Sequence, residues 1–179
     1  MKRIFLLLLV ILSCYTLHAT KPEYRINAKR TVTCKDSTDL KKIKVHVLCS
    51  NYSGNFISIT LFNHSNERIY IEWENARLYG SRIVFARDND ITMHQPKADE
   101  AISANSSSMY REITCETFVR PDYLIPLYKA KDIRKGKAGS KNIPIMLPIR
   151  FANGKVVDYN IDVLIYRDTK DNSYEDNFN

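Results

Sequence analysis

Apolar and polar residues alternate along much of the chain after about residue 29. An alternation with a period of two indicates β-strands that have one buried face. Strand segments of this kind are 44–49, 56–62, 68–74 and 109–118, and the least β-like stretch leaves room for a short helix near 122–131. The pattern predicts an all-β fold, namely an antiparallel Ig-like β-sandwich of about seven to nine strands, with a closed barrel as the alternative.

A polar turn at residues 63–66 separates two of these segments. Each segment carries three apolar residues on one face: Ile57, Ile59 and Leu61 in the first, and Ile69, Ile71 and Trp73 in the second. Two alternating segments joined by a short polar turn are typical of a β-hairpin. We therefore expect 56–62 and 68–74 to pair as an antiparallel hairpin.

A second hairpin is predicted near the C-terminus, where apolar residues alternate without a break at 143–151 and again at 157–165. A two-residue turn would place acidic residues on the apolar face, because residues opposite one another in a ladder share a face. A three-residue loop at 152–154 keeps that face apolar and places Gly154 in the left-handed conformation. The predicted pairs are Ile149 with Val157, Leu147 with Tyr159, and Ile145 with Ile161.

The N-terminus has the pattern of a secretory signal peptide. Lys2 and Arg3 precede an uncharged apolar run of nine residues at 4–12. A membrane-spanning helix needs about 20 residues, so this run is too short to cross a bilayer. We therefore expect the protein to be exported, either to the cell envelope (outer membrane or periplasm) or out of the cell.

Two cleavage sites compete in this segment. Residues 11–14 (ILSC) resemble the lipobox of bacterial lipoproteins, in which the cysteine after a small residue is lipidated, although Leu12 departs from the usual pattern. The alternative is cleavage after Ala19, which would remove Cys14. Because Cys14 stands at the end of the apolar run, we prefer the lipobox, which predicts a lipid anchor on Cys14 that attaches the protein to a membrane.

The expected division of the chain follows from these patterns. Residues 1–19 are the signal peptide, 20–28 a linker, 29–167 the β-sandwich domain, and 168–179 a polar, flexible tail.

Three further cysteines remain after either cleavage: Cys34, Cys49 and Cys115. An odd number leaves at least one free thiol in an oxidising compartment. If 30–34 and 43–49 form a simple hairpin, Cys34 and Cys49 lie roughly 20 Å apart at about 3.3 Å per residue. A disulfide requires Cα atoms within about 7 Å, which argues against this pair in a hairpin. A disulfide to Cys115, a non-hairpin arrangement and free buried thiols all stay open.

Residues 57–113 resemble the single-domain β-sandwich lipoproteins of bacterial envelopes. The similarity is carried by ISITLFNHSNERIYIEW, SRIVF and SSSMYREIT, and the later LPIRFANGKVVDYNIDV is also similar. Together with the lipobox-like start, it covers most of the chain. The resemblance implies an Ig-like fold and an envelope location, and it brings no catalytic residues.

The chain contains no recognisable catalytic or cofactor-binding motif. His46 and Cys49 are three residues apart on a predicted strand, so they point to opposite faces and cannot share a metal ion. Residues 88–99 begin like a calcium loop, but Met93 occupies the position where the turn needs glycine. We therefore expect no cofactor, no metal and no enzymatic activity.

Charge indicates one candidate contact surface. The formal net charge is +7 and becomes +5 without Lys2 and Arg3, and the segment 129–141 opposes its cations with Asp132 alone. Such a segment, expected to be a mobile loop, can contact anionic lipid or polyanionic glycans, whereas nucleic acid is not expected for an exported protein. The candidate contact residues are Lys129, Lys131, Arg134, Lys135, Lys137 and Lys141.

The sequence as a whole predicts an exported, lipid-anchored envelope β-sandwich with a non-enzymatic binding or structural role. A secreted, unanchored adhesin-like or inhibitor-like binding protein is the first alternative. An enzyme whose site leaves no sequence motif is the second.

Overall fold

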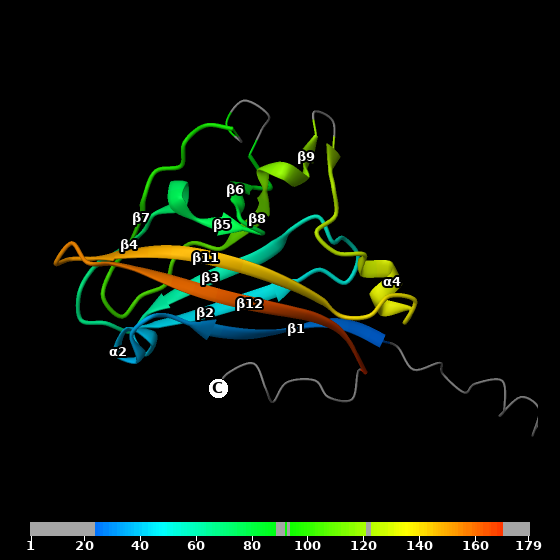
Figure 1. The fold of residues 1–179 in the computed structure, drawn as a ribbon, viewed down its shortest axis with the longest axis horizontal. Coiled ribbons are helices and arrows are strands. Elements are labelled where there is room, and N and C mark those ends of the chain that lie inside the picture. The colour runs from blue at the N-terminus through cyan, green and yellow to red at the C-terminus, as the bar shows by residue number, and fades with distance from the viewer. Residues whose placement is uncertain (1–23, 89–91, 93, 121–122, 170–179) are drawn as a thin grey trace, which may run out of the picture.

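The computed structural model describes residues 24–88, 92, 94–120 and 123–169, which form an antiparallel β structure with a few short helices (Figure 1). The prediction of an all-β fold is confirmed. In chain order the elements are β1 (Tyr24–Thr33), α2 (Ser37–Leu40), β2 (Ile43–Cys49), β3 (Ile57–Asn63), β4 (Ile69–Ile71), η1 (Trp73–Asn75), β5 (Arg77–Leu78), β6 (Ser81–Phe85), β7 (Glu100–Ile102), β8 (Arg111–Cys115), η2 (Glu116–Phe118), β9 (Val119–Arg120), β10 (Tyr123–Leu124), α4 (Ala130–Arg134), β11 (Lys141–Phe151) and β12 (Val156–Thr169).

The main sheet is a continuous path of strands in the order β1-β12-β11-β5-β6-β8-β3-β2. Strand β6 joins its two halves, because it pairs with β5 on one side and with β8 on the other. Strands β4 and β7 extend the first half beside β11. The two end strands, β1 and β2, lie next to each other without pairing, so the sheet is nearly closed.

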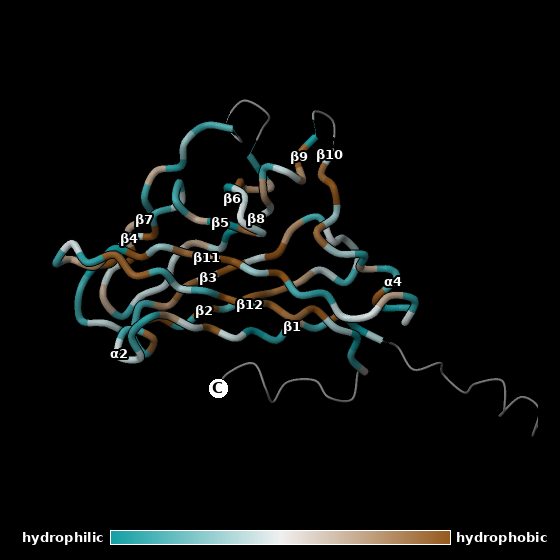
Figure 2. Tube along the Cα trace, in the orientation of Figure 1, coloured by the Kyte–Doolittle hydropathy of each residue, from teal (hydrophilic) through white to brown (hydrophobic). Residues whose placement is uncertain are grey.

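One hydrophobic core lies inside this folded sheet, since the buried residues of both halves form a single cluster. Brown and teal residues alternate along the long strands in Figure 2, as expected for strands with one buried face. Among the largest fully buried side chains are Ile57, Ile59 and Leu61 on β3, Tyr159 on β12, and Trp73.

The predicted C-terminal hairpin is confirmed in its register. Strands β11 and β12 pair Ile149 with Val157 and Ile145 with Ile161. The N–H of Gly154 donates to the carbonyl oxygen of Phe151 at 2.9 Å, and Gly154 has a φ of +82°. This positive φ favours glycine, as the three-residue loop requires.

The other predicted hairpin is wrong. Strand β3 pairs with β2 and β8, whereas β4 pairs with β11 and β7, so the turn at 63–66 crosses from one half of the sheet to the other. Asn63 holds this crossing, because its side-chain amide donates to the carbonyl oxygens of Glu67 (2.8 Å) and Ser103 (3.0 Å). Alternation on the two segments indicates only that one face of each strand is buried. Packing against the opposite half of the sheet buries that face as well as pairing within a hairpin would.

The boundaries of the domain also need correction. Strand β1 begins at Tyr24, inside the range expected to be a linker, and Ile26 is buried. Strand β12 continues to Thr169, inside the range expected to be a tail. The first residue of β1, Tyr24, pairs with the last residue of β12, Thr169. This pairing explains why each strand continues beyond its expected boundary. The expected signal peptide and Cys14 lie outside the described residues.

The three described cysteines are free thiols. Cys34 donates to the carbonyl oxygen of Asp36, and Cys49 donates to the carbonyl oxygen of Ile26 at 3.8 Å, so the two thiols lie near opposite ends of β1. The simple hairpin considered for them does not form, because β1 pairs with β12 instead of β2. Burial raises the pKa of the Cys49 thiol to about 11, which keeps it protonated and unreactive at neutral pH.

Candidate functional site

The segment 129–141 is not the mobile loop expected from the sequence. It contains the helix α4, whose Ala130 and Ile133 are buried in the core. Lysines and arginines surround these two apolar residues in the sequence, so no amphipathic pattern was visible there. The helix also begins later than the one considered near 122–131. The segment is therefore part of the folded domain.

The residues just before α4 fix its position. The N–H of Leu127 donates to the carbonyl oxygen of Gly54 at 2.7 Å, and the hydroxyl of Tyr128 donates to the carbonyl oxygen of Ser50 at 3.0 Å. A Cβ on Gly54 would lie 1.7 Å from the carbonyl oxygen of Tyr128, so this close approach requires glycine. The helix α4 packs against β1 and β12, at the end of the molecule where β1 begins (Figure 1).

Five of the six predicted contact residues gather on α4 and its flanks. Lys129 precedes the helix, Lys131 and Arg134 lie on it, and Lys135 and Lys137 follow it. All are exposed except Arg134, which is half-buried with its guanidinium 5.4 Å from the ring centre of the exposed Tyr52. We call these five residues, with Arg167, the basic end.

Arg167 joins this cluster, although it lies far from 129–141 in the sequence. It lies on β12, and a Cβ added to Gly136 would lie 2.1 Å from its guanidinium, so the two residues are in close contact. Its guanidinium also stacks over the ring of Tyr24, 3.3 Å from the ring centre. The packing of α4 against β12 brings Arg167 beside the helix. Lys141 stands apart as the first residue of β11, with its ammonium 5.3 Å from the ring centre of Tyr79.

The basic end groups several cations without described carboxylate partners on one short stretch of the surface. Within the described residues, none of its cations forms an ion pair with a carboxylate. Elsewhere Lys155 and Lys42 pair with Asp39 at 2.6 Å and 3.0 Å, and Arg87 pairs with Glu112 at 2.7 Å. The cations beside α4 are therefore not neutralised by ion pairs with described carboxylates.

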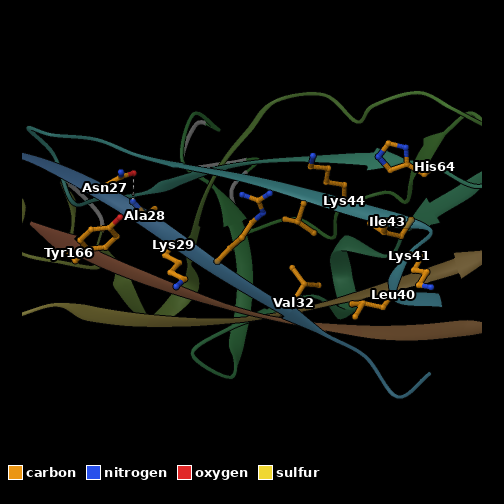
Figure 3. A pocket seen from close by; sticks show the side chains of 12 residues that line it. Asn27, Ala28, Lys29, Val32, Leu40, Lys41, Ile43, Lys44, His64 and Tyr166 are labelled. Carbon is orange, nitrogen blue, oxygen red and sulfur yellow. Dashed lines mark hydrogen bonds between the residues drawn. The ribbon is translucent and has the colours of Figure 1, made fainter. Parts of the chain in front are cut away.

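A groove of about 770 Å³ opens between β1 and β2 (Figure 3). Among the described residues that line it, five are basic and none is a carboxylate: Lys29 and Arg30 from β1, Lys41 before β2, Lys44 from β2, and His64 after β3. We call it the seam groove. No pattern in the sequence predicts this cluster, because its members come from separate segments.

Arg30 is the unusual member of the seam groove. It is half-buried, and burial lowers the pKa of its guanidinium. Among the described residues, no carboxylate or other acceptor forms a hydrogen bond or ion pair with this guanidinium. A partly buried cation without an anionic partner is costly, so the groove is suited to an anionic ligand.

Asp39 lies on α2, just after the end of β1 that is far from the basic end, and its surroundings differ from those of Arg30. Its side chain is buried, and hydrogen bonds from Lys155 and Lys42 hold the pKa of its carboxyl below the usual range. Both carboxylate oxygens are thus engaged by cations of the same chain. This arrangement stabilises the fold and leaves no free carboxylate for chemistry.

The described ranges hold neither a metal-binding cluster nor a membrane-spanning helix. No group of three or more His, Cys, Asp or Glu residues in them could hold a metal ion. No helix in the part of the chain placed by the structure has the length and apolar character to cross a membrane.

Comparisons with known proteins add little to this description. No protein-family model matches the chain, and no curated protein matches it. A crystal structure of the structural-genomics target SoR45 is 9% identical, with 86% of this chain and 91% of that chain covered, and the TM-score is 0.28. A likeness at that level carries no argument about fold or function.

Proposed function

We propose that the protein is a non-enzymatic binding protein of the cell envelope, held at a membrane by a lipid on Cys14, and that its basic end contacts an anionic surface. One observation carries the proposal. Six cations that form no ion pair with a described carboxylate lie together at the end of the domain where the chain enters at Tyr24 (Figure 1). A membrane anchor upstream of Tyr24 would hold that end close to the headgroups.

Electrostatics gives this contact its strength. A lysine or arginine close to an anionic leaflet contributes about 1 kcal/mol, and the contribution decays within a Debye length. The six cations of the basic end can together support a salt-sensitive attachment. Tyr24 and Tyr52, which lie under Arg167 and Arg134, add aromatic surface of the kind found at membrane interfaces.

The test replaces two exposed lysines of the basic end, in the variant Lys135→Glu/Lys137→Glu. Cosedimentation with vesicles of phosphatidylcholine and phosphatidylglycerol at low salt measures binding, in a Cys14→Ser background so that no lipid anchor contributes. We expect binding to weaken by at least about tenfold. The melting temperature should stay unchanged, because both side chains are exposed and have no described partner.

The matched control is Lys35→Glu/Arg68→Glu, which makes the same change in net charge at two exposed cations outside the basic end. We expect this control to retain most of the binding. Equal losses in the two variants would mean that net charge alone governs attachment, and would overturn the assignment of the contact to α4. Vesicles of pure phosphatidylcholine should bind none of the variants.

A further inference from the structure

The seam groove is the gap in an otherwise continuous sheet. Strands β1 and β2 are the two ends of the strand order, and no backbone hydrogen bond joins them in the described structure. The gap is closed near the start of β1, where the N–H of Ile26 donates to the side chain of Asn51 at 2.6 Å and Cys49 donates to the carbonyl oxygen of Ile26. Beyond this point the two strands border the groove (Figure 3).

Both strands present backbone hydrogen-bonding groups to the gap. The backbone N–H and C=O of Ile26 point toward the gap, where they bond to Asn51 and Cys49. Backbone groups alternate between the two edges of a strand, so those of Arg30 and Val32 point toward the gap as well. On β2, the N–H of His64 donates to the carbonyl oxygen of Lys42 at 2.7 Å, so Lys42 faces β3. The same alternation turns the groups of the neighbouring Ile43 toward the gap.

The charge of the groove selects among extended ligands. Among the described residues that line it, Lys29, Arg30 and Lys41 are cations and none is a carboxylate, and the half-buried Arg30 has no described acceptor. An acidic side chain placed against Arg30 would supply a charge-assisted hydrogen bond of the stronger class. Open strand edges call for a peptide backbone, which neither a glycan nor a lipid headgroup can provide.

We propose that the seam groove binds an extended acidic peptide of a partner protein by β-strand addition, with a carboxylate of the peptide against Arg30. The bound peptide would add a strand beside β1 or β2 in the gap of the sheet. The N–H of Ala28 already donates to the side chain of Asn27 at 2.8 Å, so the open donors of β1 are the N–H groups of Arg30 and Val32. The stretch from Ala28 to Val32 matches about five peptide residues, or roughly 16 Å of extended chain. This site is separate from the basic end, and it stands whether or not the protein is anchored to a membrane.

The test measures fluorescence anisotropy of a labelled ten-residue peptide of alternating valine and glutamate, added to the full mature chain. A matched peptide has lysine in place of glutamate, and a third carries N-methyl groups on several consecutive backbone nitrogens of the glutamate peptide, which blocks both edges of the strand. We expect the glutamate peptide to bind at least about tenfold more tightly than either of the other two. Strand addition requires the backbone N–H groups, so equal binding of the N-methylated peptide would overturn it.

Variants of the protein locate the site. We expect Arg30→Gln to weaken binding of the glutamate peptide by about tenfold. The control Arg68→Gln, which removes an exposed arginine outside the groove, should bind like the wild type. The emission of the buried Trp73, the single tryptophan of the chain, reports whether Arg30→Gln is folded. Equal binding by the folded Arg30→Gln variant and the wild type would place the peptide elsewhere.

The C-terminal residues of the chain are the competing occupant, because 171–176 carry three acidic residues. The variant Asp171→Asn/Glu175→Gln/Asp176→Asn removes their charge in the full chain. Peptide binding that stays unchanged supports a site open to a partner. A tenfold gain in binding would overturn the proposal in favour of the chain's own C-terminal residues as the occupant.

Discussion

Thr114 places a polar hydroxyl group in the buried interior of the protein. It lies on β8 opposite Val84 and is fully buried. Among the described residues its hydroxyl has no hydrogen-bond partner. A buried hydroxyl without a partner has lost its hydration without compensation, so it reduces the stability of the fold.

Replacement of this threonine by the isosteric valine should therefore stabilise the protein. We expect Thr114→Val to raise the free energy of unfolding by about 1 kcal/mol, because it removes the unpaired hydroxyl and keeps the volume. Urea unfolding followed by Trp73 fluorescence measures the change. Thr31→Val, at an exposed position of β1, is the control and should shift stability by less than about 0.5 kcal/mol. A loss of stability in Thr114→Val would show that the hydroxyl has a partner.

At the scale of elements, the short helix α2 is tied to the C-terminal hairpin. Asp39 accepts a hydrogen bond from Lys155 through its carboxylate at 2.6 Å, and its carbonyl oxygen accepts one from Tyr159 at 2.7 Å. Lys42, which follows α2, completes the ion pair. These contacts join the β1–β2 connection to β11 and β12.

This junction should depend on pH through Asp39. The pKa of Asp39 is lowered in the folded state, so its contribution to stability is complete above the unfolded pKa of about 3.9 and is lost as the pH falls through the lower folded value. We expect Asp39→Asn to lower the free energy of unfolding by about 1–2 kcal/mol at neutral pH. The difference from the wild type should shrink below about pH 4.

Urea unfolding at several pH values measures this dependence. The control Asp158→Asn changes an exposed carboxylate of β12 that has no described partner, so it should be nearly neutral in stability. A difference between wild type and Asp39→Asn that stays constant down to acid pH would contradict the ionic role of Asp39.

At the scale of the whole molecule, the charge distribution and the entry of the chain coincide. The basic end lies beside Tyr24, and ten residue steps separate Tyr24 from Cys14. A fully extended chain of that length spans roughly 35 Å, so an anchor on Cys14 would keep the basic end near the membrane.

The anchor itself makes a direct prediction. Replacement of Cys14 by serine removes the atom that would carry the lipid, so the protein should move from the membrane fraction to the soluble fraction. The mass of the mature wild-type chain checks the same point, because lipidation requires cleavage before Cys14. A variant that partitions like the wild type, or a mature chain that begins after Ala19, would rule out the anchor.

The sequence was most informative where the structural signal is local. Alternation assigned the buried faces of β2, β3, β11 and β12, and the three-residue loop set the register of the C-terminal hairpin. Hairpin pairing across Gly154 is decided by neighbouring residues, so the sequence contains all the information it needs. The concentration of cations at 129–141 was visible for the same reason.

Only the tertiary structure decided which strands pair across the molecule and which residues meet. The alternation in β3 and β4 requires a buried face but does not specify a partner strand, and the structure places these strands in different halves of the sheet. Arg167 reaches α4, and Arg30 shares a groove with Lys44 and His64, through contacts between distant segments. The physical reason is that a period of two determines the side of a strand that is buried, whereas pairing depends on the packing of the whole core.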